Sequence, residues 1–369
     1  MIGLLIQDNQ YEQDIRELLM SFYPGETYAH EVKDGLDFYV ETRLGDSAVS
    51  VLIWENGAAP EGWKLSDSRT RPSDLSDHSA TKNVIKKMFY LMLAARTGKE
   101  MPWGSLTGIR PTKIALTRLE EGWKEEDIRS FMKETYLASD EKIDLSIEIA
   151  AREKKLLEPL DYERGYSLYV GIPFCPTTCL YCSFTSYPIE KWRGRTGLYL
   201  EALFKELEYT ARKMEGRPLD TVYFGGGTPT SLPAEDLEAL LSRLEQLFDL
   251  SRVLEFTVEA GRPDSITPDK LKVLRDHGIT RISINPQTMN QKTLDLIGRR
   301  HTVEDVREKF HLARGLGFDN INMDLIVGLP EETLCDVKNT MEEIKALAPD
   351  SVTVHSLAIK RAARLNMFK

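Results

Sequence analysis

A regular alternation of apolar runs and helical patterns in residues 166–358 constrains the fold most. The apolar runs predict strands at Leu168–Ile172, Thr221–Phe224, Glu255–Val258, Arg281–Ile284, Ile321–Val327 and Val352–His355. Helical patterns separate them near Leu198–Lys213, Ala234–Phe248, Pro268–His277, Val303–Leu316 and Glu331–Leu347. Strands separated by helices imply a parallel α/β sheet with right-handed crossovers, here a partial (βα)6 TIM-like barrel. Active sites of such sheets lie at the C-terminal ends of the strands, so functional residues are expected there.

Residues 1–160 have a different pattern, in which strands come first and helices follow. A strand at Gly3–Ile6 and a helix at Asp8–Phe22 precede a hairpin formed by Phe38–Thr42 and Ala48–Trp54, and a polar stretch then runs from Glu55 to about Ser79. The helical pattern begins at Lys82, and the clearest helices are Thr112–Glu121, Lys124–Tyr136 and Asp140–Lys155. A chain of 369 residues favours two domains, so we expect a small α+β domain at 1–160 and the barrel at 166–369.

The overall charge restricts the classes of partner. The formal net charge is −10, and an acidic surface repels both the phosphates of nucleic acid and anionic lipid headgroups. The first residues lack the basic leader of a signal peptide, and no uncharged apolar stretch is long enough to span a bilayer. We therefore expect a cytoplasmic protein that binds neither nucleic acid nor membrane.

Three of the four cysteines, Cys175, Cys179 and Cys182, fall within eight residues directly after the first barrel strand. In a reducing cytosol such a group indicates metal ligation and not a disulfide framework. Iron–sulfur clusters are held by cysteine thiolates, normally four, but the fourth cysteine, Cys335, is far along the chain. One iron would then be free to bind a cofactor or substrate. A zinc site is the alternative, although structural zinc takes four protein ligands and no histidine is near this loop.

Further polar and glycine residues follow the predicted strands. The turn Gly225-Gly226-Gly227-Thr228 follows the second strand, and its glycines allow a ligand to approach the backbone. Glu259 ends the third strand, and Asp324 lies within the apolar fifth strand, where a carboxylate needs a partner or a ligand. Gln287 and Arg299 follow the fourth strand. Each residue also has a structural interpretation: an ordinary turn, a solvated loop residue or a hydrogen-bonded carboxylate.

The spacing C-x-x-x-C-x-aromatic-C after a barrel strand resembles the signature of the radical S-adenosylmethionine (SAM) superfamily. The resemblance implies a [4Fe–4S] cluster on Cys175, Cys179 and Cys182, whose open iron chelates SAM, and a 5′-deoxyadenosyl radical formed from SAM. It is closest to the oxygen-independent coproporphyrinogen III oxidase branch. There, the residues that touch cluster-bound SAM correspond to Tyr169, Gly226 and Glu259. Those that touch a second SAM correspond to Tyr181, Gly227, Thr228, Gln287, Arg299 and Asp324. No catalytic side chain is implied beyond the cluster and SAM.

Within that branch, a subgroup with an extra N-terminal domain has segments much like Thr107–Lys113 and Arg281–Thr288. The subgroup's coproporphyrinogen dehydrogenases imply a porphyrinogen substrate, decarboxylated to protoporphyrinogen IX in haem biosynthesis, and an electron donor such as flavodoxin or ferredoxin. Members continue beyond the length of this chain, so a C-terminal region is expected to be missing. The motif ends in Cys182-Ser183-Phe184-Thr185 and not in Cys-Gly-Cys-Asn, which is closer to the haem chaperones. A haem chaperone and a radical SAM enzyme acting on haem are therefore the alternative functions.

Overall fold

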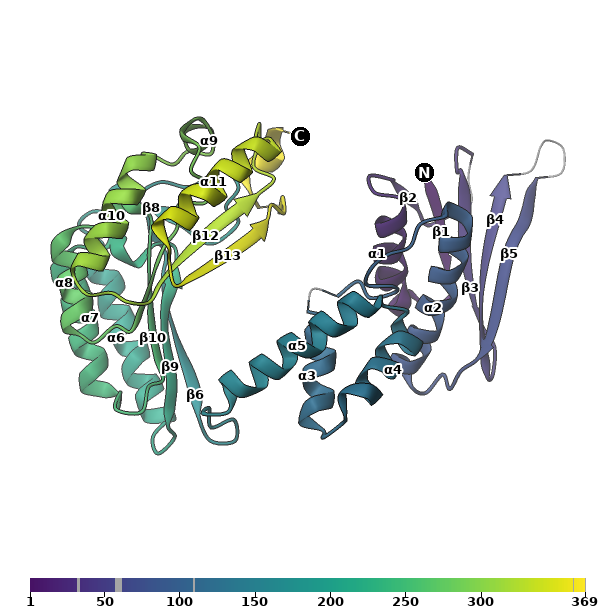
Figure 1. Cartoon of the computed structure of the whole chain (residues 1–369), viewed down its shortest axis with the longest axis horizontal. Helices are drawn as coiled ribbons and strands as arrows, with labels where there is room; N and C mark the ends of the chain where they lie inside the picture. The colour runs from purple at the N-terminus through teal and green to yellow at the C-terminus, as the bar shows by residue number, and fades with distance from the viewer. Residues whose placement is uncertain (32–33, 57–61, 109, 361, 369) are drawn as a thin grey trace. The chain divides into compact units, whose positions relative to one another are not determined.

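The computed structural model describes residues 1–31, 34–56, 62–108, 110–360 and 362–368. The chain divides into two compact units, Met1–Glu158 and Pro159–Lys369, which are coloured from purple to yellow along the sequence in Figure 1. Each unit has its own hydrophobic core. Among the described residues, none of the helices combines the length and apolar character needed to cross a membrane.

The first unit contains a mixed five-stranded sheet in the order β2-β1-β3-β4-β5. Its strands are β1 (Ile2–Ile6), β2 (Tyr28–Ala29), β3 (Phe38–Leu44), β4 (Ala48–Asn56) and β5 (Trp63–Pro72). Strand β1 runs parallel to both β2 and β3, whereas β3, β4 and β5 are antiparallel. Helices α1 (Glu12–Phe22) and α2 (His78–Thr97) contribute to the core beside this sheet. Helix α1 buries Ile15, Leu18, Leu19 and Phe22, which is the spacing of one helical face.

Strand β5 lies between Glu55 and Ser79, where the polar sequence did not predict a strand. It is an edge strand, and most of its side chains are partly or fully exposed. An edge strand with two solvated faces does not need an apolar side, so its sequence lacks the alternation that reveals a half-buried strand. Three further helices complete the unit and share a small core: α3 (Thr112–Glu120), α4 (Glu125–Tyr136) and α5 (Asp140–Leu157).

The second unit contains a six-stranded, fully parallel sheet in the order β13-β12-β11-β10-β9-β6. Its strands are β6 (Tyr166–Ile172), β9 (Leu219–Gly226), β10 (Glu255–Gly261), β11 (Arg281–Ile284), β12 (Ile321–Val327) and β13 (Ser351–Ser356). The helices between them are α6 (Thr196–Lys213), α7 (Ala234–Leu247), α8 (Pro268–Asp276), α9 (Gln291–Leu296), α10 (Val303–Gly315) and α11 (Leu334–Leu347). This topology confirms the predicted parallel α/β fold with a partial (βα)6 barrel.

The two faces of this sheet differ in character. Figure 1 shows α6, α7, α8 and α10 along one face, where apolar side chains such as Leu240 of α7 are fully buried. The opposite face has polar side chains in register: Glu259 lies beside Ser283, which in turn lies beside Asn322. A row of buried or half-buried polar groups on one face is costly unless the groups bind one another or a ligand. The polar face is therefore the side on which to look for function.

Candidate functional site

The three clustered cysteines lie in one loop, residues 173–187, which we call the cysteine loop. It is closed by the short parallel strands β7 (Phe174–Cys175) and β8 (Tyr187–Pro188), with the Tyr187 amide donating to the Pro173 carbonyl at 2.8 Å. Cys175 and Cys179 are buried, and Cys182 is half-buried. Cys335 is exposed, near the start of α11. The loop leads directly from β6, so its cysteines lie at the C-terminal end of the sheet.

The Cys182 amide donates to the Cys179 carbonyl at 3.3 Å, and burial shifts the pKa values of two of the three thiols. Burial raises the pKa of Cys175, the Thr228 hydroxyl at 3.5 Å from its sulfur opposes the shift, and the charges of Cys179 and Cys182 add to it. Burial also raises the pKa of Cys182, and Cys179 adds to that shift. The thiols of Cys175 and Cys182 are therefore protonated at neutral pH, and a metal must displace their protons to bind.

The donor set fits an iron–sulfur cluster better than a single ion. Among the described residues, no three His, Cys, Asp or Glu side chains are grouped so that they could hold one metal ion. Cluster thiolates each bind a different iron, so their sulfurs do not have to meet at one point. Cys175, Cys179 and Cys182 offer three sulfur donors from one loop, which is the type of ligand that such a cluster needs.

The glycine-rich turn at the end of β9 packs directly against the cysteine loop. Gly226 has φ +104°, a conformation that favours glycine. The amides of Gly227 and Thr228 donate to the carbonyls of Ile172 and Phe174, both at 2.7 Å. A Cβ on Gly227 would lie 2.5 Å from the Phe174 carbonyl oxygen. Glycine is therefore needed for the turn to approach the loop closely at this point.

Glu259 lies on the polar face within a cluster of aromatic hydroxyls. The Tyr223 hydroxyl donates to its carboxylate at 2.5 Å, and the Tyr223 ring stacks on Tyr169 with centroids 5.8 Å apart. Burial raises the pKa of Glu259, the Tyr223 hydrogen bond opposes this, and the charge of Asp324 adds to the rise. Tyr169 is 60% exposed although it belongs to a strand, so its ring is available to a ligand.

Arg299 and Tyr181 both interact electrostatically with Cys179. Burial raises the pKa of Tyr181, the charge of Arg299 opposes this shift, and the charge of Cys179 adds to it. The guanidinium of Arg299 is almost fully buried and donates to the carbonyls of Asn285 and Pro286, and, although burial opposes it, the charge of Cys179 helps to raise its pKa. Its Nε has no partner among the described residues. A buried cation of this kind requires nearby negative charge.

Gln287 and Asp324 are joined through the backbone. Gln287 has φ +68°, its amide donates to the Asp324 carbonyl at 2.9 Å, and its own carbonyl accepts from the Ile326 amide. Its side-chain oxygen is buried without a partner within the described part of the chain. The Asp324 carboxylate accepts from Asn322 at 2.7 Å. A left-handed glutamine with an unsatisfied oxygen is strained, as is common at binding sites.

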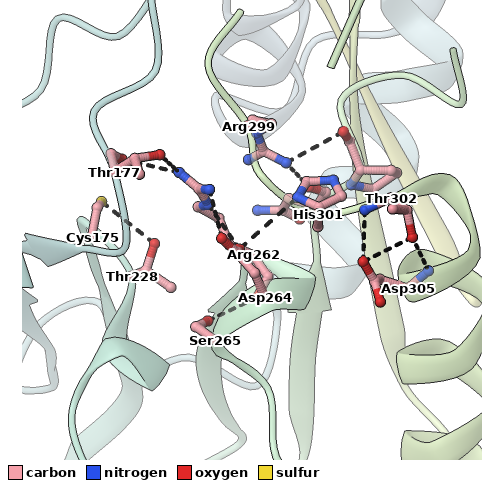
Figure 2. A network of polar contacts seen from close by, with 12 residues as sticks. Cys175, Thr177, Thr228, Arg262, Asp264, Ser265, Arg299, His301, Thr302 and Asp305 are labelled. Atoms are coloured by element: carbon pink, nitrogen blue, oxygen red, sulfur yellow. Dashed lines mark hydrogen bonds and ion pairs between the residues drawn. The ribbon is translucent and has the colours of Figure 1, made fainter. Parts of the chain in front are cut away.

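The predicted site residues therefore gather at the C-terminal ends and on the polar face of one sheet. Three residues beside them were missed from the sequence. Tyr223 comes two residues before Gly225, so strand alternation alone could have placed it on the same face. Arg262 and Asp264 follow β10, and Figure 2 shows them between Thr177 of the cysteine loop and His301. Arg262 and Asp264 belong to none of the sequence motifs described above.

Comparison with known proteins agrees with this architecture. Residues 169–344 match the radical SAM superfamily. The oxygen-independent coproporphyrinogen-III oxidase-like protein HemZ of Bacillus subtilis is 38% identical over 99% of this chain and 74% of its own length. The haem chaperone HemW of the same organism is 38% identical over 53% of this chain and 51% of its own length. The structure of coproporphyrinogen III oxidase (HemN) from Escherichia coli matches with a TM-score of 0.50 and 31% identity, over 57% of this chain and 51% of that one.

These matches define a radical SAM fold, and the cofactors of that superfamily are a [4Fe–4S] cluster and SAM. The chain belongs to the radical SAM superfamily and, within it, to the family of oxygen-independent coproporphyrinogen-III oxidase-like proteins. It spans about three quarters of HemZ but only about half of HemW and HemN. The relatives carry both oxidase and chaperone names, so membership alone leaves the reaction open.

Proposed function

We propose that this chain is a radical SAM enzyme that oxidatively decarboxylates propionate side chains of coproporphyrinogen III. The observation that carries its cofactor chemistry is the environment of Cys179, where two arginines are buried. Arg262 Nη1 lies 3.9 Å from the Cys179 sulfur, and the charges of Cys179 and Asp264 both act on Arg299. A cluster held by cysteine thiolates would add negative charge beside these buried cations. A zinc site formed by the same three cysteines lacks a fourth protein ligand among the described residues.

The residues of the chain bind and orient the two cofactors. Cys175, Cys179 and Cys182 would hold the cluster, and the Gly226–Thr228 turn beside them offers the close backbone approach that a SAM amino group needs. Glu259, kept in place by Tyr223, would accept hydrogen bonds from SAM. When bound, the cluster supplies the electron that cleaves SAM to methionine and the 5′-deoxyadenosyl radical.

The substrate step follows from that radical. It would take a β-hydrogen from a propionate and become 5′-deoxyadenosine. The substrate radical would then release carbon dioxide and pass one electron to an external one-electron acceptor, which leaves a vinyl group. Two propionates would consume two SAM molecules, and a one-electron donor of the flavodoxin or ferredoxin type would reduce the cluster. The HemZ similarity supports this assignment, since it covers nearly the whole chain whereas the HemW and HemN matches cover little more than half of it.

A haem-binding role is the second candidate, and one exposed ring favours it. Phe184 is 76% exposed although it lies two residues after Cys182, next to the proposed cluster. An aromatic ring in this position can stack on a porphyrin plane. HemW, which matches the barrel at 38% identity, is named a haem chaperone.

Product analysis separates the two functions. Anaerobically reconstituted protein, dithionite and SAM are mixed with coproporphyrinogen III, and 5′-deoxyadenosine and vinyl-bearing products are quantified by mass spectrometry. Cys179→Ser protein is the control. We expect both products from the wild type and neither from the control. Haem titration of the same preparation, with tight binding and no vinyl product, would reject the decarboxylase and support the chaperone.

A further inference from the structure

Arg262 is a buried arginine whose guanidinium is held on one side by a single carboxylate. Its side chain is 3% exposed. Nε donates to Asp264 Oδ1 at 3.0 Å, and Nη2 donates to Oδ2 at 2.7 Å. This forked pair fixes the plane and the direction of the guanidinium. Figure 2 shows the pair between the cysteine loop and His301, with the remaining amino group directed towards the loop.

The other side of the guanidinium contacts the segment between the first two cysteines. Nη1 donates to the Thr177 carbonyl at 3.0 Å and to the Thr177 hydroxyl at 2.6 Å. The same nitrogen lies 3.9 Å from the Cys179 sulfur. Thr177 in turn donates to the Gly298 carbonyl at 2.9 Å. Arg262 therefore joins the end of β10 to the cysteine loop and to the backbone next to Arg299.

These contacts matter for a metal cluster because reduction adds negative charge to it. Hydrogen bonds to cluster sulfurs and nearby positive charge stabilise the reduced form, and both are known means by which proteins adjust cluster potentials. Charges in a buried site are weakly screened, so a change in either Arg262 or Asp264 should be felt at the cluster. Arg262 and Asp264 are not among the residues that the resemblance assigns to SAM.

We propose that Arg262, oriented by Asp264, is a positioning residue that anchors the cysteine loop through Thr177 and sets the cluster's reduction potential through Cys179. The proposal rests on the cluster assigned under the proposed function but not on the choice of substrate. It predicts opposite effects for the two partners. Arg262→Gln removes the cation and leaves Asp264 unpaired, so the cluster should be harder to reduce. Asp264→Asn keeps Arg262 and removes its counter-charge, so the cluster should be easier to reduce.

The test is an anaerobic redox titration of reconstituted protein, with the reduced cluster followed by electron paramagnetic resonance. At the wild-type midpoint potential, the ratio of reduced to oxidised cluster should fall about tenfold in Arg262→Gln, which is ~59 mV for one electron. It should rise in Asp264→Asn. The matched control is Arg307→Gln, because Arg307 is also paired with carboxylates, those of Glu304 and Glu343, but on the surface of α10. Its ratio should be unchanged.

A second readout tests the anchoring. Iron release to a chelator should be about tenfold faster from Arg262→Gln than from the wild type or from Arg307→Gln. If Arg262→Gln does not retain iron, Arg262→Lys replaces it, since lysine keeps the charge but cannot form the forked contacts. The proposal is overturned if the ratio of reduced to oxidised cluster is the same in the wild type, Arg262→Gln and Asp264→Asn. It is also overturned if the ratio changes in the same direction in both variants. A wild type that holds no iron–sulfur cluster rejects the proposed function itself.

Discussion

Substituting Gly227 with alanine should separate the glycine-rich turn from the cysteine loop. An added Cβ would lie 2.5 Å from the Phe174 carbonyl oxygen and 2.9 Å from that of Ile172. Real Cβ atoms do not approach backbone oxygens this closely, so the turn and the loop must move apart. Phe174 directly precedes Cys175, and the movement is therefore transmitted to the proposed cluster ligands.

The size of the effect follows from the hydrogen bonds that the movement breaks. The bonds from the amides of Gly227 and Thr228 to Ile172 and Phe174 are both 2.7 Å long. A backbone hydrogen bond contributes about 1 kcal/mol net, so losing both costs about 2 kcal/mol. That corresponds to a change of about 30-fold in the local opening equilibrium.

Amide hydrogen exchange measured by mass spectrometry, together with iron content after reconstitution, tests this reasoning. In Gly227→Ala, peptides that contain Gly227 and Thr228 should exchange about 30-fold faster, and bound iron should fall. Gly197→Ala is the control because Gly197 is exposed in α6 with no atom within 4 Å of an added Cβ. That substitution should stabilise the helix by about 0.5–1 kcal/mol. Unchanged exchange and full iron loading in Gly227→Ala would refute the argument.

Three further predictions follow from single side chains. Cys179→Ser should abolish the charge-transfer absorption of the cluster, whereas Cys335→Ser should leave it intact; equal spectra from the two variants would exclude Cys179 as a ligand. Glu259→Gln should weaken SAM binding at least tenfold in equilibrium dialysis without loss of iron, and iron loss in a folded variant would contradict the assigned role. A third prediction concerns His277, whose ion pairs with Glu245 and Glu238 lie away from the candidate site. Burial alone would lower the pKa of His277, but its hydrogen bonds to Glu245 and Glu238 outweigh burial and raise it. This stabilisation is present below the ordinary histidine pKa and is lost as the pH rises through the raised value. His277→Gln should therefore lower the melting temperature more at pH 6 than at pH 9, and an effect independent of pH would count against the ion pairs.

Much of the barrel could be predicted because its strands are apolar and its helices are amphipathic. The ranges Arg281–Ile284 and Ile321–Val327 were predicted to the residue. The edge strand β5 was missed because solvated faces leave no periodic signal. The six-residue helix α9 was missed because it is too short to show a helical period.

Only those residues of the candidate site that belong to local sequence motifs could be predicted. Cysteine spacing and glycine turns are local patterns, so Cys175 and Gly226 could be predicted as site residues from the sequence. The pairing of Arg262 with Thr177 depends on tertiary structure, because these residues are 85 positions apart in the chain. The buried, unsatisfied oxygen of Gln287 likewise becomes visible only when its surroundings are known.

The most direct test of the central claim is electron paramagnetic resonance of the dithionite-reduced protein before and after addition of SAM. A cluster held by only Cys175, Cys179 and Cys182 has an open iron, so SAM should change the g values of its signal. Iron and sulfide analysis of the same sample should give about four of each per chain. An unchanged spectrum, or zinc in place of iron after anaerobic purification, would contradict the account.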